Sequence, residues 1–118
     1  LLQSNGSAGK NKQDHDVITP ALLYISEHYR EQIDLDQCAA LTHLSPGRFA
    51  HLFTKTMSVS PYKFILSMRM DEAKELLLFS SMSINEISEQ IGFTDSSYFS
   101  RIFRKYTGYS PTSWRSRF

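Results

Sequence analysis

Basic side chains gather in two stretches of this chain, at spacings that suit the binding of anionic oxygen atoms. Residues 45–70 contain four basic residues and no acidic one, and residues 95–118 contain five basic residues against Asp95 alone. The net charge is only +1, because residues 71–94 carry five acidic residues against Lys74. This uneven distribution indicates two local basic surfaces rather than a generally basic protein.

Groups for catalysis or metal binding do not occur at useful spacings. His15, His28 and His43 have no partners at metal-ligand spacing, and the single cysteine, Cys38, lies in an apolar segment where a small buried hydrophobe is expected. The sequence shows no trio of nucleophile, base and orienting group and no Gly-rich phosphate loop. We therefore expect no enzyme activity, no metal and no cofactor.

The composition, with 41% hydrophobic and 21% charged residues, is typical of a soluble globular domain. No apolar run approaches the roughly 18 to 20 residues that span a bilayer, and no signal-peptide pattern opens the chain, so we expect a cytoplasmic protein without membrane contact. Residues 1–16 are mostly polar, which predicts a flexible linker from an upstream domain. A remnant of an expression vector would look much the same.

The apolar residues recur at helical spacing, which predicts an all-α fold of about seven helices. These helices position the basic residues. The first helix starts at Thr19-Pro20 and buries a stripe of Leu22, Ile25 and Tyr29. The others are expected over residues 35–41, 46–56, 62–78, 84–91 and 96–106, with a short last helix that opens at Ser110-Pro111.

A repeat at an offset of fifty residues is the strongest signal in the sequence. It pairs Phe49 with Phe99, Phe53 with Phe103, Lys55 with Lys105, Ser60 with Ser110 and Pro61 with Pro111. Each copy predicts a short helix, a tight turn and a longer helix with an aromatic inner face and a basic outer face, which is a helix-turn-helix unit. Small residues, Ala39 and Ser88, allow the two helices of each unit to cross closely.

The repeat divides the chain into two helix-turn-helix subdomains, residues 17–59 and 80–118, joined by a long linker helix within residues 60–79. A helix of this length spans about 25 Å. Two units with basic second helices would then fit two successive major grooves of a DNA duplex, about 34 Å apart.

Three segments resemble the DNA-binding domain of the AraC/XylS family of bacterial transcription regulators. They are "IGFTDSSYFSRIFRKYTGYSP" (91–111), "LSPGRFAHLFTKTMSVSP" (44–61) and "RMDEAKELL" (69–77). The resemblance covers about residues 17–118 and implies a seven-helix, two-lobed domain, with the effector or signal sensed outside this chain. The family often has Gly near Ser58, so we expect a less sharply turned end of the third helix; Ser88 stands where Ala is usual.

The resemblance also implies roles for the exposed faces, since the family's base-facing positions correspond to Gly47 and His51. Candidate base contacts are Arg48, His51, Ser96, Ser97 and Arg101, with Arg101 the best candidate for reading a guanine. Candidate phosphate contacts are Ser45, Thr54, Lys55, Arg104 and Lys105. Basic residues on a helix exterior are often only solvated, whereas the repeated phenylalanines and Trp114 are expected in the core. Tyr98 fits either a core or a surface role.

The leading hypothesis is sequence-specific binding of double-stranded DNA that regulates transcription. The alternative is a helical protein-interaction module that contacts transcription machinery such as RNA polymerase, with only incidental DNA contact. The acidic residues Asp71, Glu72 and Glu75 would suit such a partner.

Overall fold

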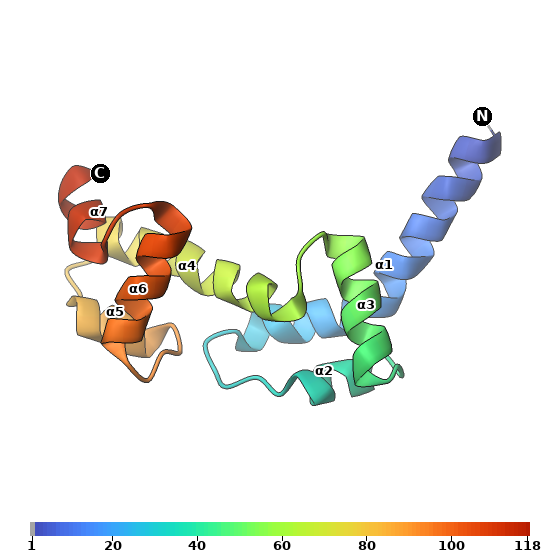
Figure 1. Cartoon of the computed structure of the whole chain (residues 1–118), viewed down its shortest axis with the longest axis horizontal. Helices are drawn as coiled ribbons and strands as arrows, with labels where there is room; N and C mark the ends of the chain where they lie inside the picture. The colour runs from blue at the N-terminus through green and yellow to red at the C-terminus, as the bar shows by residue number, and fades with distance from the viewer. Residues whose placement is uncertain (1) are drawn as a thin grey trace. The chain divides into compact units, whose positions relative to one another are not determined.

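The computed structural model describes the backbone of residues 2–118 and the side chains of residues 12–118, and this part of the chain holds seven α-helices and no strand (Figure 1). The helices are α1 (Leu2–His28), α2 (Leu35–Leu41), α3 (Pro46–Met57), α4 (Pro61–Phe79), α5 (Ile84–Gln90), α6 (Ser96–Thr107) and α7 (Pro111–Arg117). The prediction of an all-α fold with about seven helices is confirmed.

The chain forms two compact units. Unit 1 contains α1, α2, α3 and the start of α4 as far as Ile65. Unit 2 contains the short segment Tyr29–Gln32, the rest of α4 from Leu66, and α5, α6 and α7. Each unit therefore has one predicted helix-turn-helix pair, α2 with α3 or α5 with α6.

The first helix begins earlier than the sequence predicted. Pro20 lies inside α1 rather than at its start. Proline removes one backbone N–H from a helix interior, and close to that break the Thr19 hydroxyl donates a hydrogen bond to the carbonyl oxygen of His15 at 2.8 Å. Residues 12–16 are thus helical, whereas Leu1 lies outside the described residues. The role of residues 1–16 as a linker from an upstream domain stays a prediction.

The core of unit 1 explains why α1 continues through Pro20. Ile18, Ala21 and Ile25 are fully buried and follow one another at helical spacing. This stripe starts before Pro20, so the helix must start before it as well. The predicted stripe of Leu22, Ile25 and Tyr29 was correct only for Ile25, because the other two side chains are half-buried.

The two units repeat the same aromatic packing, as the offset of fifty predicts. The ring centroids of Phe49 and Phe53 in α3 are 5.7 Å apart, and those of Phe99 and Phe103 in α6 are 5.8 Å apart. All four side chains are at most 1% exposed, which confirms their place in the core. A further aromatic ring from the next helix completes each cluster: Phe64 lies 5.6 Å from Phe53, and Trp114 lies 5.8 Å from Phe103.

The helix ends also match between the copies. Ser45 and Asp95 cap α3 and α6 by accepting hydrogen bonds from Arg48 N at 3.3 Å and from Ser97 N at 2.8 Å. Both helices end in a left-handed residue, Ser58 with φ 67° and Gly108 with φ 85°. The expectation of a less sharp turn at Ser58 was therefore wrong, because serine adopts the conformation that glycine usually takes.

The turn inside each helix-turn-helix unit has a positive φ as well. His43 has φ 62° in the first unit, and Gly92 has φ 105° in the second. Ala39 and Ser88, at the predicted close crossings, are 0% and 2% exposed. A larger side chain at either position would force α2 from α3, or α5 from α6.

Candidate nucleic-acid interface

The face of α3 opposite its phenylalanines carries the predicted contact residues of unit 1. At 100° per residue, positions 47, 48, 51, 54 and 55 fall within about one third of the helix circumference. Arg48, His51, Thr54 and Lys55 are all exposed, as is Ser45 at the helix start. The structure thus gathers the five predicted contact residues of this unit on or beside one face of one helix.

Two of these side chains already have partners in unit 1. The Thr54 hydroxyl donates to the carbonyl oxygen of Ala50 at 2.8 Å. Lys55 Nζ lies 3.4 Å from a carboxylate oxygen of Asp14 in α1, with side chains that are 50% and 22% exposed. Because the lysine is half exposed, its ammonium group remains open to a second anion, and a phosphate there would compete with Asp14.

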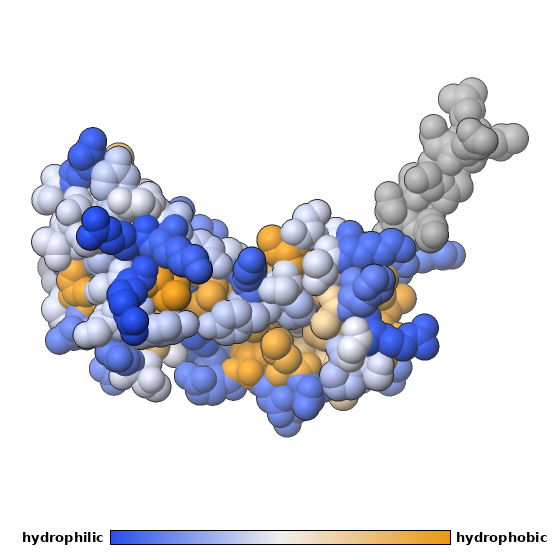
Figure 2. All heavy atoms as spheres, viewed as in Figure 1, coloured by the Kyte–Doolittle hydropathy of each residue, from blue (hydrophilic) through white to orange (hydrophobic). Residues whose placement is uncertain are grey.

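The matching face of α6 is more basic than that of α3. Arg101, Arg104 and Lys105 are exposed and occupy the positions of His51, Thr54 and Lys55 in the first copy. Strongly hydrophilic side chains lie over α3 and over α6 in the space-filling view (Figure 2). Among the residues whose side chains are described, none forms an ion pair with Arg101, Arg104 or Lys105. Their charges are therefore available to an external anion.

Arg101 is held above the ring of Tyr98, with its guanidinium carbon 5.7 Å from the ring centroid. A contact of this kind restricts the arginine without removing its hydrogen-bond donors. Tyr98 is 36% exposed, so it serves both the core and the surface. Ser96 and Ser97 lie in the first turn of α6, where Ser97 is exposed and Ser96 is half-buried. Both hydroxyl groups are therefore close to the N-terminal end of the helix.

Three arginines of the basic stretches have structural roles that charge counting missed. Arg69 of α4 donates to the carbonyl oxygens of Tyr29 at 2.6 Å and Glu31 at 2.7 Å. Arg115 of α7 donates to the carbonyl oxygens of Leu77, Ser80 and Leu76 at 2.9, 3.3 and 3.5 Å, which closes the C-terminal end of α4. The guanidinium of Arg117 lies 4.9 Å from the ring centroid of Tyr109.

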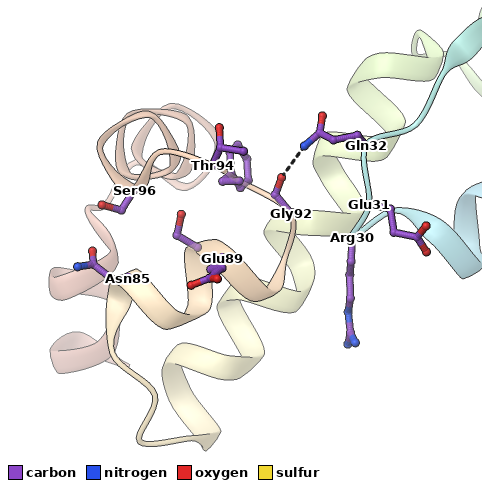
Figure 3. A pocket seen from close by; sticks show the side chains of 10 residues that line it. Arg30, Glu31, Gln32, Asn85, Glu89, Gly92, Thr94 and Ser96 are labelled. Carbon is purple, nitrogen blue, oxygen red and sulfur yellow. Dashed lines mark hydrogen bonds between the residues drawn. The ribbon is translucent and has the colours of Figure 1, made fainter.

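A polar pocket of about 660 Å³ lies beside the start of α6 in unit 2 (Figure 3). Its walls come from segment 29–32, from α5 and from the turn that joins α5 to α6. Gln32 donates across it to the carbonyl oxygen of Gly92 at 3.2 Å. The pocket contains acidic side chains, Glu31 and Glu89, as well as Arg30, so its charge does not favour a phosphate as the faces of α3 and α6 do.

Other chemistries gain no support from the described side chains. Burial raises the pKa of the Cys38 thiol, with a smaller contribution from the negative charge of Asp34, and a raised pKa disfavours the reactive thiolate. Across residues 12–118, no three His, Cys, Asp or Glu side chains gather as a metal site requires. Over the same residues, no helix combines the length and apolar character needed to cross a bilayer.

Comparison with known proteins places this geometry in context. A family model described as a helix-turn-helix domain matches residues 38–117. The arabinose operon regulatory protein of Salmonella typhimurium is 36% identical over 100 residues, which cover 84% of this chain and 36% of that protein. The chain thus spans about a third of the length of such curated relatives.

Several solved structures share the fold over most of their length. The C-terminal domain of the two-component response regulator yesN from Fusobacterium nucleatum is 33% identical, with a TM-score of 0.76, and the match covers 80% of this chain and 93% of that one. The DNA-binding domain of the global transcriptional factor AdpA, solved in complex with a target DNA, is 26% identical with a TM-score of 0.79, over 85% of this chain and 90% of that one.

Proposed function

Because this chain belongs to the AraC/XylS family of helix-turn-helix DNA-binding domains, we propose that it binds double-stranded DNA sequence-specifically through α3 and α6 and thereby regulates transcription. The observation that carries this function is the duplicated exposed face. Two helices of twelve residues each present their polar side at equivalent positions, while their aromatic side is buried. A structurally similar domain has been solved with its target DNA bound.

The dimensions of these helices suit the major groove. An α-helix with its side chains is about 10–12 Å across, and the major groove is about 12 Å wide. The exposed faces of α3 and α6 supply donors for base edges, from Arg48 and His51 in one unit and from Ser96, Ser97 and Arg101 in the other. Arg101 is the strongest candidate, because its guanidinium can donate two hydrogen bonds to one guanine and is oriented by the Tyr98 ring.

Phosphate contacts come from the rims of the same faces. We assign them to Ser45, Thr54, Lys55, Arg104 and Lys105, all of which are exposed. Backbone N–H groups at the starts of the recognition helices, and of the helices after Pro61 and Pro111, add further donors. Such contacts hold the protein on any duplex and carry no sequence information.

Two helix-turn-helix units in one chain call for two short recognition sites. We propose that they lie about one helical turn apart, on successive major grooves separated by about 34 Å. A dimeric repressor obtains two such sites by symmetry, whereas one chain with two units has them in tandem. Selection of binding sites from random duplex tests this directly, since a single short motif would contradict the two-site reading.

The assignment of individual side chains is tested by two substitutions in α6. Arg101→Ala should cost about 1–3 kcal/mol on the selected duplex and relax the preference at one base pair. Lys105→Ala should weaken binding to selected and random duplex alike and reduce the salt dependence by about one counterion. Equal losses on both duplexes for Arg101→Ala would contradict its role in base recognition.

The remaining proposals concern the rest of the whole protein and its protein partner. Since the chain spans about a third of such proteins, we propose that an effector or signal is sensed by a domain outside it. We also propose that the whole protein acts in the cytoplasm and that it is a regulator rather than an enzyme. Asp71 and Glu75 are exposed on α4 and are the residues we propose for contact with RNA polymerase. Their substitution should change transcription activation while leaving DNA affinity unchanged.

A further inference from the structure

Two side chains of α4, one helical turn apart, fasten segment 29–32 within unit 2. Arg69 donates to the carbonyl oxygens of Tyr29 and Glu31 at 2.6 and 2.7 Å. Glu72 accepts from the Tyr29 hydroxyl at 2.8 Å and from both Nε and Nη2 of Arg30. Burial raises the pKa of the Tyr29 phenol, and the bond to Glu72 raises it further, so the phenol stays a donor at neutral pH. The segment is thus held at several points.

Arg69 also reaches the turn of the second helix-turn-helix unit. It donates to the carbonyl oxygen of Gly92 at 3.4 Å. Gln32 of the fastened segment donates to the same oxygen at 3.2 Å (Figure 3). The guanidinium carbon of Arg69 lies 5.4 Å from the centroid of the Phe93 ring. One arginine therefore holds the backbone and the first side chain of the turn that leads into α6.

A continuous series of side-chain contacts leads from this turn to the exposed face of α6. The Phe93 ring lies 5.8 Å from the Tyr98 ring, and the Tyr98 ring lies 5.7 Å from the guanidinium of Arg101. Phe93 also packs 5.5 Å from Phe99 in the core and is only 7% exposed. The order Arg69, Phe93, Tyr98, Arg101 thus joins an arginine of α4 to the arginine assigned to base recognition.

We propose that Arg69 is a positioning residue for DNA recognition: through Phe93 and Tyr98 it fixes the direction in which Arg101 leaves α6, without touching DNA itself. The inference rests on the proposed function, because it concerns how Arg101 meets a base. It differs from the simple electrostatic role that the position of Arg69 in a basic stretch suggests. The property that this role needs is the planar guanidinium of Arg69 with its several N–H donors, which a lysine cannot reproduce.

The test compares variants of the full 118-residue chain on two probes, the duplex selected from random sequence and a random competitor duplex. Arg69→Gln should reduce discrimination at the base pair that Arg101→Ala relaxes, by about tenfold. Its affinity for random duplex and its salt dependence should stay within about twofold of the unchanged chain, because no phosphate contact is lost. Arg69→Lys should remain nearly as defective as Arg69→Gln, although it keeps the charge.

A double-substitution cycle separates positioning from independent contact. If Arg69 acts through Arg101, Arg69→Gln should have no further effect on base preference when Arg101 is already alanine. Tyr98→Leu breaks this series of contacts but leaves the Arg69 hydrogen bonds to the backbone of Tyr29, Glu31 and Gly92 in place, so it should reproduce the loss at the same base pair. This second variant keeps the inference testable if Arg69→Gln fails to fold.

Arg115→Gln is the matched control, since Arg115 also donates to three backbone carbonyl oxygens in unit 2. It should keep full base discrimination at temperatures where the domain is folded. Loss of discrimination in this control, full rescue by Arg69→Lys, equal losses on both probes, or additive losses in the cycle would each overturn the positioning role. If Arg101→Ala leaves every preference intact, the proposed base contact fails instead. If only Arg101→Ala relaxes a base pair, the positioning role alone fails.

Discussion

Replacing Gly92 by alanine adds one methyl group at the most crowded glycine of the second unit. A Cβ atom built there would lie 2.5 Å from the carbonyl oxygen of Arg30 and 2.9 Å from its carbonyl carbon. Both are backbone atoms of segment 29–32, which is fastened by Arg69 and Glu72 and has little freedom to move. The positive φ of 105° adds strain of its own.

The expected loss of stability is the sum of these two contributions. A side chain at positive φ costs about 1–2 kcal/mol, and forcing a methyl group into a packed site costs about 1–3 kcal/mol. We therefore expect Gly92→Ala to lower the free energy of unfolding by about 2–5 kcal/mol. In a unit of this size each kcal/mol lowers the melting temperature by roughly 4–8 °C.

Gly108 supplies the matched control, because it shares the backbone conformation but not the crowding. Its φ is 85°, and no atom lies within 4 Å of an added Cβ. Gly108→Ala should lose only the conformational contribution, about 1–2 kcal/mol. Gly47, inside α3 and equally uncrowded, should gain up to about 1 kcal/mol on substitution by alanine, from helix propensity.

The assay is urea and thermal unfolding of the three variants, monitored by far-ultraviolet circular dichroism. Gly92→Ala should be clearly less stable than Gly108→Ala, and Gly47→Ala should be no less stable than the unchanged chain. Equal destabilisation by the first two would mean that segment 29–32 moves away at no cost. The fastening by Arg69 and Glu72 would then be too weak to position anything.

Three further predictions follow from single contacts. Asp14→Asn should raise the affinity for any duplex by up to about fivefold, because breaking a surface ion pair of about 0.2–1 kcal/mol frees Lys55. Unchanged binding in a gel-shift titration would show that Lys55 does not contact phosphate. The pKa of Glu86 is lowered, chiefly by the hydrogen bond from the Ser83 backbone. The stabilising effect of the Glu86 carboxylate is therefore present above about pH 4.5 and disappears as the pH falls through the lowered pKa. Glu86→Gln should flatten the plot of urea midpoint against pH in this range, and an unaltered plot would show that the contact is absent in solution. Arg115→Gln should lower the unfolding free energy by about 1–3 kcal/mol, since it removes the donor to the carbonyl oxygens of Leu77 and Ser80 at the end of α4. A melting temperature equal to that of the unchanged chain would show that water replaces the guanidinium.

Local signals in the sequence predicted most helix boundaries. Capping residues predicted the starts of α3, α6 and α7, and the apolar period predicted the buried faces of α3 and α6. These signals succeed because a cap and a helical stripe depend on neighbours only a few residues away. The start of α1 was missed because a Thr-Pro pair suits a helix start and also fits within a longer helix when a buried residue, here Ile18, precedes it.

The roles of Arg69, Glu72 and Arg115 could not be predicted from the sequence. Each side chain bonds groups that are far from it along the chain, such as Tyr29 from Arg69 across 40 residues. Charge counting assigned Arg69 to a basic stretch and Glu72 to a possible protein partner, because it treats every charged side chain as solvated. The exposed face of α6 was easier to predict, since its geometry follows from one helix alone.

The offset of fifty residues also has an optical consequence. Where the first unit places Phe64 against Phe53, the second places Trp114 against Phe103, and Trp114 is the only tryptophan of the chain. Its indole fluorescence thus reports on the aromatic cluster of unit 2, while the corresponding cluster of unit 1 contributes no tryptophan signal. Unfolding followed by fluorescence and by circular dichroism would coincide only if the two units melt together, so the sequence contains its own probe of cooperativity between its two halves.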